Sequence, residues 1–519
     1  MTEPELRGDE IQGDSLAGFR KDHVALLFLR FDETRIGAVK EWLGKLWPRL
    51  ATLNAVAQFN DAYRTMRRMF KARVDARTLP PDPELYAIWV NIAFTASGIA
   101  KLAGPGALTG FETAFVMGAE ARAGVIGDAE DGSPGSPQTW IVGAGKNVPD
   151  AMLNIAVDYE PDLAGTVAAM RSELATFGGA IEIIHIDTGN AKIAPQKGHE
   201  HFGFRDGISQ PAVRGILDAP TRPLLTPRLI PEDDPQHPGC AAPGVPLVQP
   251  GEFVLGYIRQ DPDDPDETQQ QLPTPPEPEW ARDGSYLVYR RLAQNVPEFR
   301  AFLDDGAAEL TRAGFTGIDA GRFGAMCVGR WKDGSPMART PLVPDPVMAA
   351  HPTGPQDFYF WKDTPSADGR PSATMDADGQ RCPVSAHIRK INPRDEATDT
   401  GHNPRTLRRR IIRRGVTYGP SYDVRPDEER GLLFLCYQAS ITDQFEFLWR
   451  LWANKNDTPR GSAGIDPIIG QNPLQPRDTH FVQGNLDATV TTDRRFIFST
   501  GGAYLFAPSI SAIRDVLAR

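Results

Sequence analysis

Residues 24–31 read "VALLFLRF", a run of eight residues with a single charge near its end. Such a short apolar run is typical of a β-strand. In the next segment, Ile36–Leu50, apolar residues from Val39 to Leu46 recur every three or four positions. That spacing predicts a helix with one buried face. The sequence therefore predicts a strand followed directly by an amphipathic helix.

The same unit recurs along the chain. We expect further strands and helices at Met152–Val157 (strand), Asp162–Thr176 (helix), Ile181–Ile186 (strand), Tyr286–Leu292 (strand), Val296–Leu303 (helix), Gly431–Gln438 (strand), Thr442–Trp452 (helix), Arg495–Ser499 (strand) and Ala503–Ala507 (strand). Units of this kind in both halves predict an α+β protein with two domains, each an open sheet with helices on one face.

Proline-rich segments divide the pattern. Residues 219–251 contain many prolines and no periodicity, which predicts a linker or a long surface excursion. We therefore expect an N-terminal domain over 1–218, a linker over 219–251 and a C-terminal domain over 252–519. Residues 261–279 and 364–380 are expected to be loops.

Composition excludes several classes of protein. The 519 residues have a formal net charge of −11, which disfavours a nucleic-acid-binding protein. There is no apolar run long enough to cross a membrane, and the N-terminus does not resemble a signal peptide. The cysteines are scattered, which argues against disulfides and against a zinc site; they are Cys240, Cys327, Cys382 and Cys436. We expect a cytoplasmic protein with reduced thiols.

A charged pair stands in a glycine-rich loop, "HFGFRDGISQP" at His201–Pro211. Glycines permit tight turns and the close approach of a ligand. Asp206 has two interpretations: a turn former that bonds to its own backbone, or a carboxylate presented over a cavity. The loop by itself does not separate them.

Two basic segments are further candidates. In "CPVSAHIRKINPR", Cys382–Arg394, His387 is either structural or a ligand, and three basic residues follow it. Arg389, Lys390 and Arg394 either neutralise an anionic cofactor or form a solvated basic surface. In "RRRIIRRGVTYG", Arg408–Gly419, an apolar pair interrupts the arginines, which predicts a short strand that points one arginine inward.

Together, "GFRDG", "CPVSAHIRKINPR" and "IIRRGVTYG" resemble, in this order, the dye-decolorizing peroxidase family of haem enzymes. The resemblance extends from residue 11 to 507 and includes "IQGDSLAGFRKDHVALLFLRF", "CVGRWKDGSPM", "GLLFLCYQASITDQFEFLWRLWAN" and "GIDPIIGQ". The length and the proline-rich insertions resemble the longer, bacterial-type members.

The resemblance implies two ferredoxin-like domains, with haem b (iron protoporphyrin IX) held in the C-terminal half. It implies a peroxidase that reduces hydrogen peroxide and oxidises dyes, phenols or similar bulky reductants. By motif match, His387 is the proximal iron ligand and Asp206 is the distal acid and base. Arg413, rather than Arg414, matches the distal arginine, which stabilises developing negative charge. Because an unperturbed aspartate titrates near 4, we expect an acidic rate optimum.

Supporting residues follow from the same motifs. An iron-bound histidine usually donates its other N–H to a carboxylate, and Asp466 is the candidate, with a helix cap or turn as the alternative. Arg389 is expected to pair with a haem propionate. Leu432 and Phe434 either wall the haem pocket or are plain core. Gly203, Phe204 and Gly207 are expected beside the cofactor.

Two other functions stay open. A haem carrier or storage protein needs neither Asp206 nor Arg413. A non-haem metal hydrolase would use His199 and His201, which stand two residues apart. The expected partners are peroxide and a small-molecule reductant, with no nucleic acid and no membrane.

Overall fold

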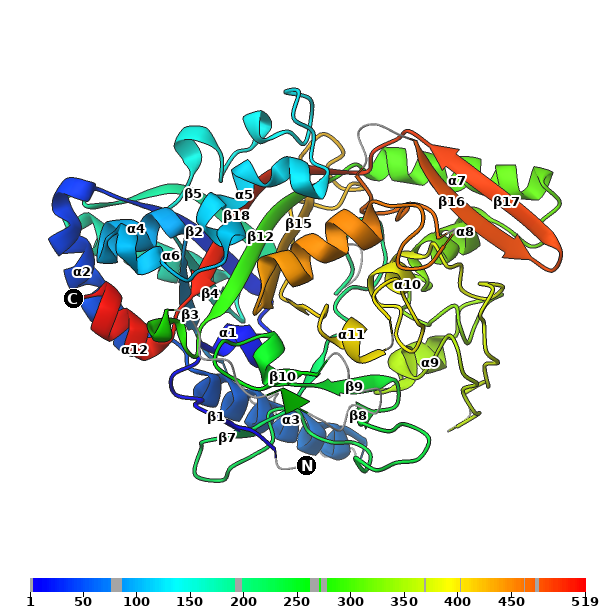
Figure 1. Ribbon diagram of the computed structural model, residues 1–519, viewed down its shortest axis with the longest axis horizontal. Coiled ribbons are helices and arrows are strands. Elements are labelled where there is room, and N and C mark those ends of the chain that lie inside the picture. The colour runs from blue at the N-terminus through cyan, green and yellow to red at the C-terminus, as the bar shows by residue number, and fades with distance from the viewer. Residues whose placement is uncertain are drawn as a thin grey trace.

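The computed structural model describes residues 3–75, 86–191, 198–261, 270–271, 278–367, 370–401, 403–461, 463–471 and 476–519. A nine-stranded sheet runs through the middle of the molecule (Figure 1). Its strands are β2 (His23–Phe31), β3 (Trp89–Phe94), β4 (Ala151–Val157), β5 (Ile181–Asn190), β12 (Ser285–Gln294), β13 (Ile412–Arg413), β14 (Val416–Tyr418), β15 (Gly431–Gln438) and β18 (Ile497–Ala507).

The order of these strands separates the two halves of the chain. It runs β13-β15-β12-β18-β3-β4-β2-β5, with β14 beside β15, and the pairing inside it is antiparallel. Strands from before residue 191 form one end, and strands from after residue 284 form the other. The halves join where Phe506 of β18 pairs with Phe94 of β3. The expected α+β class is confirmed, and the two half-sheets form one continuous sheet.

Helices cover the sheet and fill the two ends of the molecule (Figure 1). Their bounds are α1 (Gly13–Leu16), α2 (Ile36–Leu46), α3 (Leu53–Asp75), α4 (Ala96–Ala103), α5 (Thr113–Ala121), α6 (Glu160–Ala175), α7 (Val296–Arg312), α8 (Ala320–Val328), α9 (Pro346–Ala350), α10 (His387–Ile391), α11 (Asn403–Leu407) and α12 (Ile510–Ala512). The α2 helix buries Val39, Trp42, Leu43 and Leu46, the face that the periodicity predicts.

Short strands make small additional sheets. They are β1 (Glu5–Leu6), β6 (Ala212–Val213), β7 (Ile216–Leu217), β8 (Cys240–Ala242), β9 (Val245–Val248), β10 (Arg259–Gln260), β11 (Gln270–Gln271), β16 (Arg477–Gln483) and β17 (Leu486–Thr492). The β16–β17 hairpin extends away from the main sheet (Figure 1).

Two expected elements take a different form. The helix expected at Thr442–Trp452 is present as two wide π-type turns, Ile441–Glu446 and Leu448–Ala453. The two strands expected at the C-terminus are one strand, β18, with Gly501 and Gly502 inside it. The segment around Trp140 and Val142 approaches these glycines closely, and a Cβ there would meet its atoms at 3.0–3.1 Å. Glycine inside a strand commonly marks such an approach.

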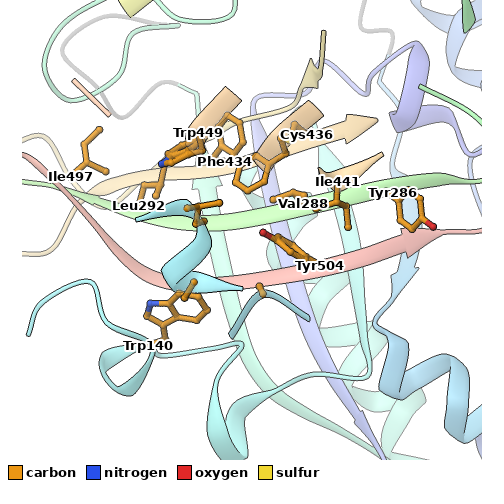
Figure 2. Packing of buried hydrophobic residues seen from close by; sticks show 14 of the residues in the cluster. Trp140, Tyr286, Val288, Leu292, Phe434, Cys436, Ile441, Trp449, Ile497 and Tyr504 are labelled. Atoms are coloured by element: carbon orange, nitrogen blue, oxygen red, sulfur yellow. The ribbon is translucent and has the colours of Figure 1, made fainter. Parts of the chain in front are cut away.

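The core lies on both faces of the sheet. Figure 2 shows Phe434 of β15, Leu292 of β12 and Trp449 among the buried residues on one face. The rings of Phe434 and Trp449 pack edge to face, with centroids 5.9 Å apart. This face forms one wall of the cavity described below.

The C-terminal segment and the proline-rich segment both make contacts across the expected domain limits. Residues after β18 return to the N-terminal half, where the C-terminal helix lies beside α2 and α4 (Figure 1). Residues 219–251 contain β8 and β9, and β9 pairs with β6. That segment is therefore built into the structure and does more than connect. The limits 1–218, 219–251 and 252–519 stay a prediction.

In the part of the chain that the structure describes, no helix is long and apolar enough to cross a membrane. All four cysteines are buried and none forms a disulfide.

Candidate functional site

A second carboxylate, that of Glu200, fixes the turn of the glycine-rich loop that carries Asp206. Gly203 and Gly207 both adopt the left-handed backbone, with φ of 94° and 72°. Glu200, just before the loop, accepts hydrogen bonds from the backbone N–H groups of Phe202 and Phe204, each at 2.8 Å. The tight turn that glycine permits is thus fixed by a side chain within it.

Asp206 both forms the turn and presents a carboxylate, so the two interpretations that the sequence left open hold together. Its Oδ1 accepts a hydrogen bond from the backbone N–H of Gly207 at 2.6 Å, which is the turn. The same oxygen accepts Nη1 of Arg413 at 2.6 Å. Burial alone would raise the pKa of Asp206, but the charge of Arg413 and these hydrogen bonds outweigh burial and lower it. Asp206 is therefore an ionised carboxylate.

Alternation of side chains at the end of β13 separates the two adjacent arginines, Arg413 in the strand and Arg414 just after it. Arg413 turns toward Asp206, and its Nη2 also donates to the carbonyl of Ser209 at 3.1 Å. Arg414 turns the other way and donates to the carbonyls of Asp14 and Leu16, each at 2.8 Å. Successive strand residues point to opposite faces, so only one of the pair reaches the loop. It is the arginine that the motif selects.

His387 begins the short helix α10, and Asp466 holds its ring. The Nδ1 of His387 lies 2.8 Å from Oδ2 of Asp466, a fully buried carboxylate. The other oxygen of Asp466 accepts the backbone N–H groups of Ile468 and Ile469. Burial opposes ionisation of Asp466, but His387 and these N–H groups lower its pKa. A negative Asp466 places the ring proton on Nδ1 and leaves Nε2 with a free lone pair, as a metal ligand requires.

One cavity joins these groups. His387, Asp206 and Arg413 all line it, and most of the rest of its wall is apolar. Leu432, Phe434, Phe204 and Gly207 all line it. Other apolar wall residues are Leu292, Phe445, Leu448, Trp449, Ile468 and Ile469. Gly203 shapes the loop without lining the cavity. The cavity thus places a histidine with a free nitrogen, a carboxylate and a guanidinium within one apolar enclosure.

Two buried arginines in the cavity wall have no carboxylate partner among the described residues. Arg330 donates to the carbonyls of Gly334 and Pro355. Arg394 donates to three carbonyls and lies over the ring of Phe358. Burial, with the mutual repulsion of nearby guanidinium groups, lowers the pKa of Arg330 to about 9; burial lowers that of Arg394 to about 10. A bound anion would relieve both, and the carboxylates of a cofactor have that charge.

The expected propionate pairing of Arg389 does not fit this arrangement. Its guanidinium is fully buried outside the cavity, where it bonds to Glu396 and Asp376. On a helix, a residue two positions after His387 points about 200° away from it, so Arg389 faces the opposite side. Lys390 is also buried and donates to the carbonyls of Lys455, Thr458 and Gly464. Of the three basic residues in this segment, Arg394 reaches the cavity.

The two histidines before the loop do not form a metal site. The Nε2 of His201 bonds to the carbonyl of Tyr418, and the Nε2 of His199 lies 3.1 Å from the carbonyl of Lys332. Within the described ranges, no group of three or more His, Cys, Asp or Glu side chains could hold a metal ion. The hydrolase alternative therefore has no support.

Sequence reasoning missed two residues of the cavity. Glu200 lies between His199 and His201 and was not among the expected site residues, yet it accepts Gln294 Nε2 at 2.6 Å as well as the two backbone N–H groups. Burial, with Asp206 nearby, raises its pKa to about 7. Arg330 lies in "CVGRWKDGSPM", where nothing local distinguishes it from a surface arginine. Both owe their properties to burial, which is a tertiary feature.

Comparison with known proteins agrees with this chemistry. The model of the family "Dyp-type peroxidase, C-terminal" matches residues 327–460. The chain is 33% identical to dye-decolorizing peroxidase msp1 of Mycetinis scorodonius, over 98% of this chain and 87% of that protein. It is 28% identical to the multifunctional dye peroxidase DyP2 of an Amycolatopsis strain, over 98% and 95%.

Solved structures give the same result. An ancestral D-type dye-decolorizing peroxidase superposes with a TM-score of 0.73 at 30% identity, covering 99% of this chain and all of that one. A decolorizing peroxidase of Auricularia auricula-judae superposes with a TM-score of 0.72 at 28% identity, with the same coverage. The relatives at about 33% identity are fungal, so a bacterial-type subdivision is not supported.

Proposed function

The chain belongs to the dye-decolorizing peroxidase family, and from that premise we propose that His387, Asp206 and Arg413 are the working residues of its haem site. Haem peroxidases of this family act on dyes and take hydrogen peroxide as oxidant. The observation that carries the proposal is the shared cavity: an aspartate-held histidine and an arginine-held aspartate line the same apolar space.

The residues of the cavity fit haem b. The apolar walls suit the macrocycle, and Nε2 of His387 suits its iron. Arg330 and Arg394 suit the two propionates, because both are buried cations without carboxylate partners among the described residues. When bound, haem supplies the iron that binds peroxide and takes up its oxidising equivalents.

The chain's own residues then move one proton and stabilise charge. Asp206 Oδ1 is engaged by Arg413 and Gly207, whereas no described residue donates to Oδ2. We assign Oδ2 to the proton transfer: it accepts the proton from the near oxygen of peroxide and returns it to the far oxygen as the O–O bond breaks. Arg413 stays protonated and stabilises the developing negative charge. Asp466 keeps the Nδ1 proton on His387.

Absorption spectra of the wild type and of His387→Ala test the cofactor assignment. We expect a Soret band in the wild type and a lost or shifted band in the variant. No Soret band after reconstitution of the wild type with haem would contradict the proposal. The storage alternative predicts haem binding without turnover, so oxidation of a dye with peroxide separates the two functions.

We also propose a cytoplasmic location. Four buried cysteines without a disulfide support it, since such thiols are typical of a reducing compartment. Fractionation of the source cells tests it: we expect the haem protein with the cytoplasmic fraction, and recovery outside the cell would contradict the proposal.

A further inference from the structure

A second hollow lies beside the haem cavity. It has a volume of about 1300 Å³, and its wall comes from residues 14–21, from α3, from residues 223–228 and from β13 and β14. Gly207, Ile208, Gln210 and Arg413 line both spaces. The loop that presents Asp206, together with Arg413, is therefore a shared wall between them. A ligand in this hollow would lie next to the catalytic loop without entering the haem cavity.

Basic side chains gather in this hollow. Besides Arg413 they are Arg20, Lys21, Arg64, Arg228 and Arg414, whereas its acidic lining residues are Asp14 and Asp61. Five of the six cations have a carboxylate partner: Arg413 has Asp206, Lys21 has Asp158, Arg64 has Asp61, Arg228 has Glu3 and Arg414 has Asp14. One positive charge is left over in a chain whose net charge is −11.

Arg20 is that charge. It is exposed toward the hollow, and no hydrogen bond or ion pair joins it to any described residue. The walls of the hollow keep part of the solvent away from its guanidinium, and this partial desolvation, with the neighbouring charges of Arg414 and Arg64, lowers its pKa. These neighbours repel it, so an anion bound between them would be attracted by more than one guanidinium.

The backbone at Arg20 is strained. Its φ is 53°, in the left-handed region that residues other than glycine rarely adopt. Two residues earlier, Gly18 has a φ of 73°, and a Cβ there would lie 2.7 Å from the guanidinium of Arg414. The turn therefore brings two guanidinium groups to one wall. A non-glycine residue kept in this conformation is a reason to look for function.

The rest of the wall is largely apolar. It includes Leu16, Phe19, Val24, Ile208, Leu217, Leu224, Leu225 and Leu435. A guanidinium is planar and matches a carboxylate through two parallel hydrogen bonds, and an apolar surface favours an aromatic ring. A single free arginine favours a ligand with one negative charge. The combination describes an aromatic carboxylate.

We propose that this hollow binds an aromatic carboxylate with a phenolic hydroxyl, which is oxidised there as a reductant of the enzyme. Its carboxylate pairs with Arg20, and its ring lies on the apolar wall. The assignment rests on the proposed peroxidase function for the oxidation, but not for the binding. Each ligand loses one electron and its phenolic proton, and two such oxidations, with one hydrogen peroxide, give two phenoxyl radicals and two waters.

Equilibrium binding tests the site without turnover. Ferric holoenzyme is titrated calorimetrically, in the absence of peroxide, with 4-hydroxybenzoate and with its neutral analogue 4-hydroxybenzamide. In Arg20→Gln we expect the Kd for the benzoate to rise roughly tenfold, as the loss of a charge-assisted pair predicts, while the Kd for the benzamide changes little. Arg20→Lys keeps the charge and should retain most of the affinity.

A matched control makes the same charge change elsewhere. Arg171 is exposed on α6, outside the hollow, and Arg171→Gln should leave both Kd values unchanged. Benzoate binding that is equal in the wild type and Arg20→Gln, or a benzamide affinity that falls equally, would overturn the proposal. If a neutral phenol is turned over normally but benzoate does not bind, only the proposed binding site is contradicted. If benzoate binds as expected but no substrate is turned over, the proposed peroxidase function is contradicted and the binding site stands.

Discussion

The guanidinium of Arg413 lies 2.6 Å from the carboxylate of Asp206, although 207 residues separate them in the chain. The pair forms because β13 lies at the edge of the main sheet, next to the glycine-rich loop. Gln210 ties the two segments further: its Nε2 donates to the carbonyl of Arg413, and its Oε1 accepts the N–H of the same residue. The catalytic pair is thus held by backbone contacts as well as by charge.

Replacement of Asp206 should remove proton transfer and leave the cofactor bound. We expect Asp206→Asn to lower kcat/KM for hydrogen peroxide roughly a hundred- to ten-thousand-fold, the usual contribution of a general acid and base. Stopped-flow kinetics with the ferric enzyme measure this. The Soret band should stay, and Asp131→Asn, on an exposed turn, should behave as the wild type. An unchanged rate in Asp206→Asn would assign the proton transfer elsewhere.

The acid limit of activity should lie low. Arg413 lowers the pKa of Asp206, so the active carboxylate persists below the ordinary value of 3.8. In Arg413→Leu the charge and the hydrogen bond of Arg413 are lost and only the Gly207 N–H and the charge of His387 still oppose burial, so the acid limb of the kcat/KM profile should move to higher pH. The rate itself should also fall, by roughly a hundred-fold or more. A profile of Arg413→Leu with the wild-type limb would contradict the pairing. Arg414→Leu, its neighbour, should keep the wild-type profile.

Asp466 should control how firmly His387 binds iron. Asp466→Asn keeps the shape but removes the negative charge, so the affinity for haem should fall roughly ten- to a hundred-fold and the reduction potential should rise. Titration of the apoprotein with haem and spectroelectrochemistry measure the two effects. Asp478→Asn is the control, since that carboxylate bonds to Thr491 near the surface. Equal haem affinity and potential in Asp466→Asn and the wild type would show that the charge has no effect on the iron.

Local sequence predicted most of the elements, whereas the family resemblance gave His387, Asp206 and Arg413, whose roles stay a proposal. The strand β2 follows from an apolar run and the helix α2 from periodicity, whereas Arg413 is preferred to Arg414 by its place in the motif, directly after the apolar pair. The propionate pairing expected for Arg389 rests on its charge alone. The angle between successive helix residues places its side chain opposite that of His387. The properties of Arg330 and Glu200 come from burial by segments far along the chain, which no local pattern contains.

Single variants of Arg389 and Arg394 should distinguish an effect on cofactor binding from an effect on stability. Arg394→Gln should weaken haem binding, because that cation lines the cavity. Arg389→Gln should instead remove the charged partner of the buried Asp376 and leave Glu396 with only the longer ion pair to Arg460, at a cost of about 3–5 kcal/mol in the free energy of unfolding. Haem titration and urea unfolding measure the two quantities. Weaker haem binding in folded Arg389→Gln, with normal stability, would restore the propionate pairing.

Glu200 should make stability depend on pH near neutrality. Its pKa is raised from 4.5 to about 7, so the folded state favours the protonated carboxyl. The resulting stabilisation is fully present below pH 4.5 and is lost as the pH rises through 7. At 1.36 kcal/mol per pKa unit this amounts to about 3 kcal/mol between pH 4.5 and 8. Glu200→Gln cannot titrate, so only the wild type loses this stabilisation. The free energy of unfolding of the wild type minus that of the variant should therefore fall by that amount as the pH rises.

Urea unfolding of the two proteins at pH 4.5, 6 and 8 measures this difference. Asp206, which also lines the cavity, has a lowered pKa and titrates below this window, so it does not distort the comparison. A difference that is constant with pH would mean that Glu200 is already ionised in the folded protein. In that case the backbone N–H groups of Phe202 and Phe204 and the amide of Gln294 stabilise its charge more than burial opposes it.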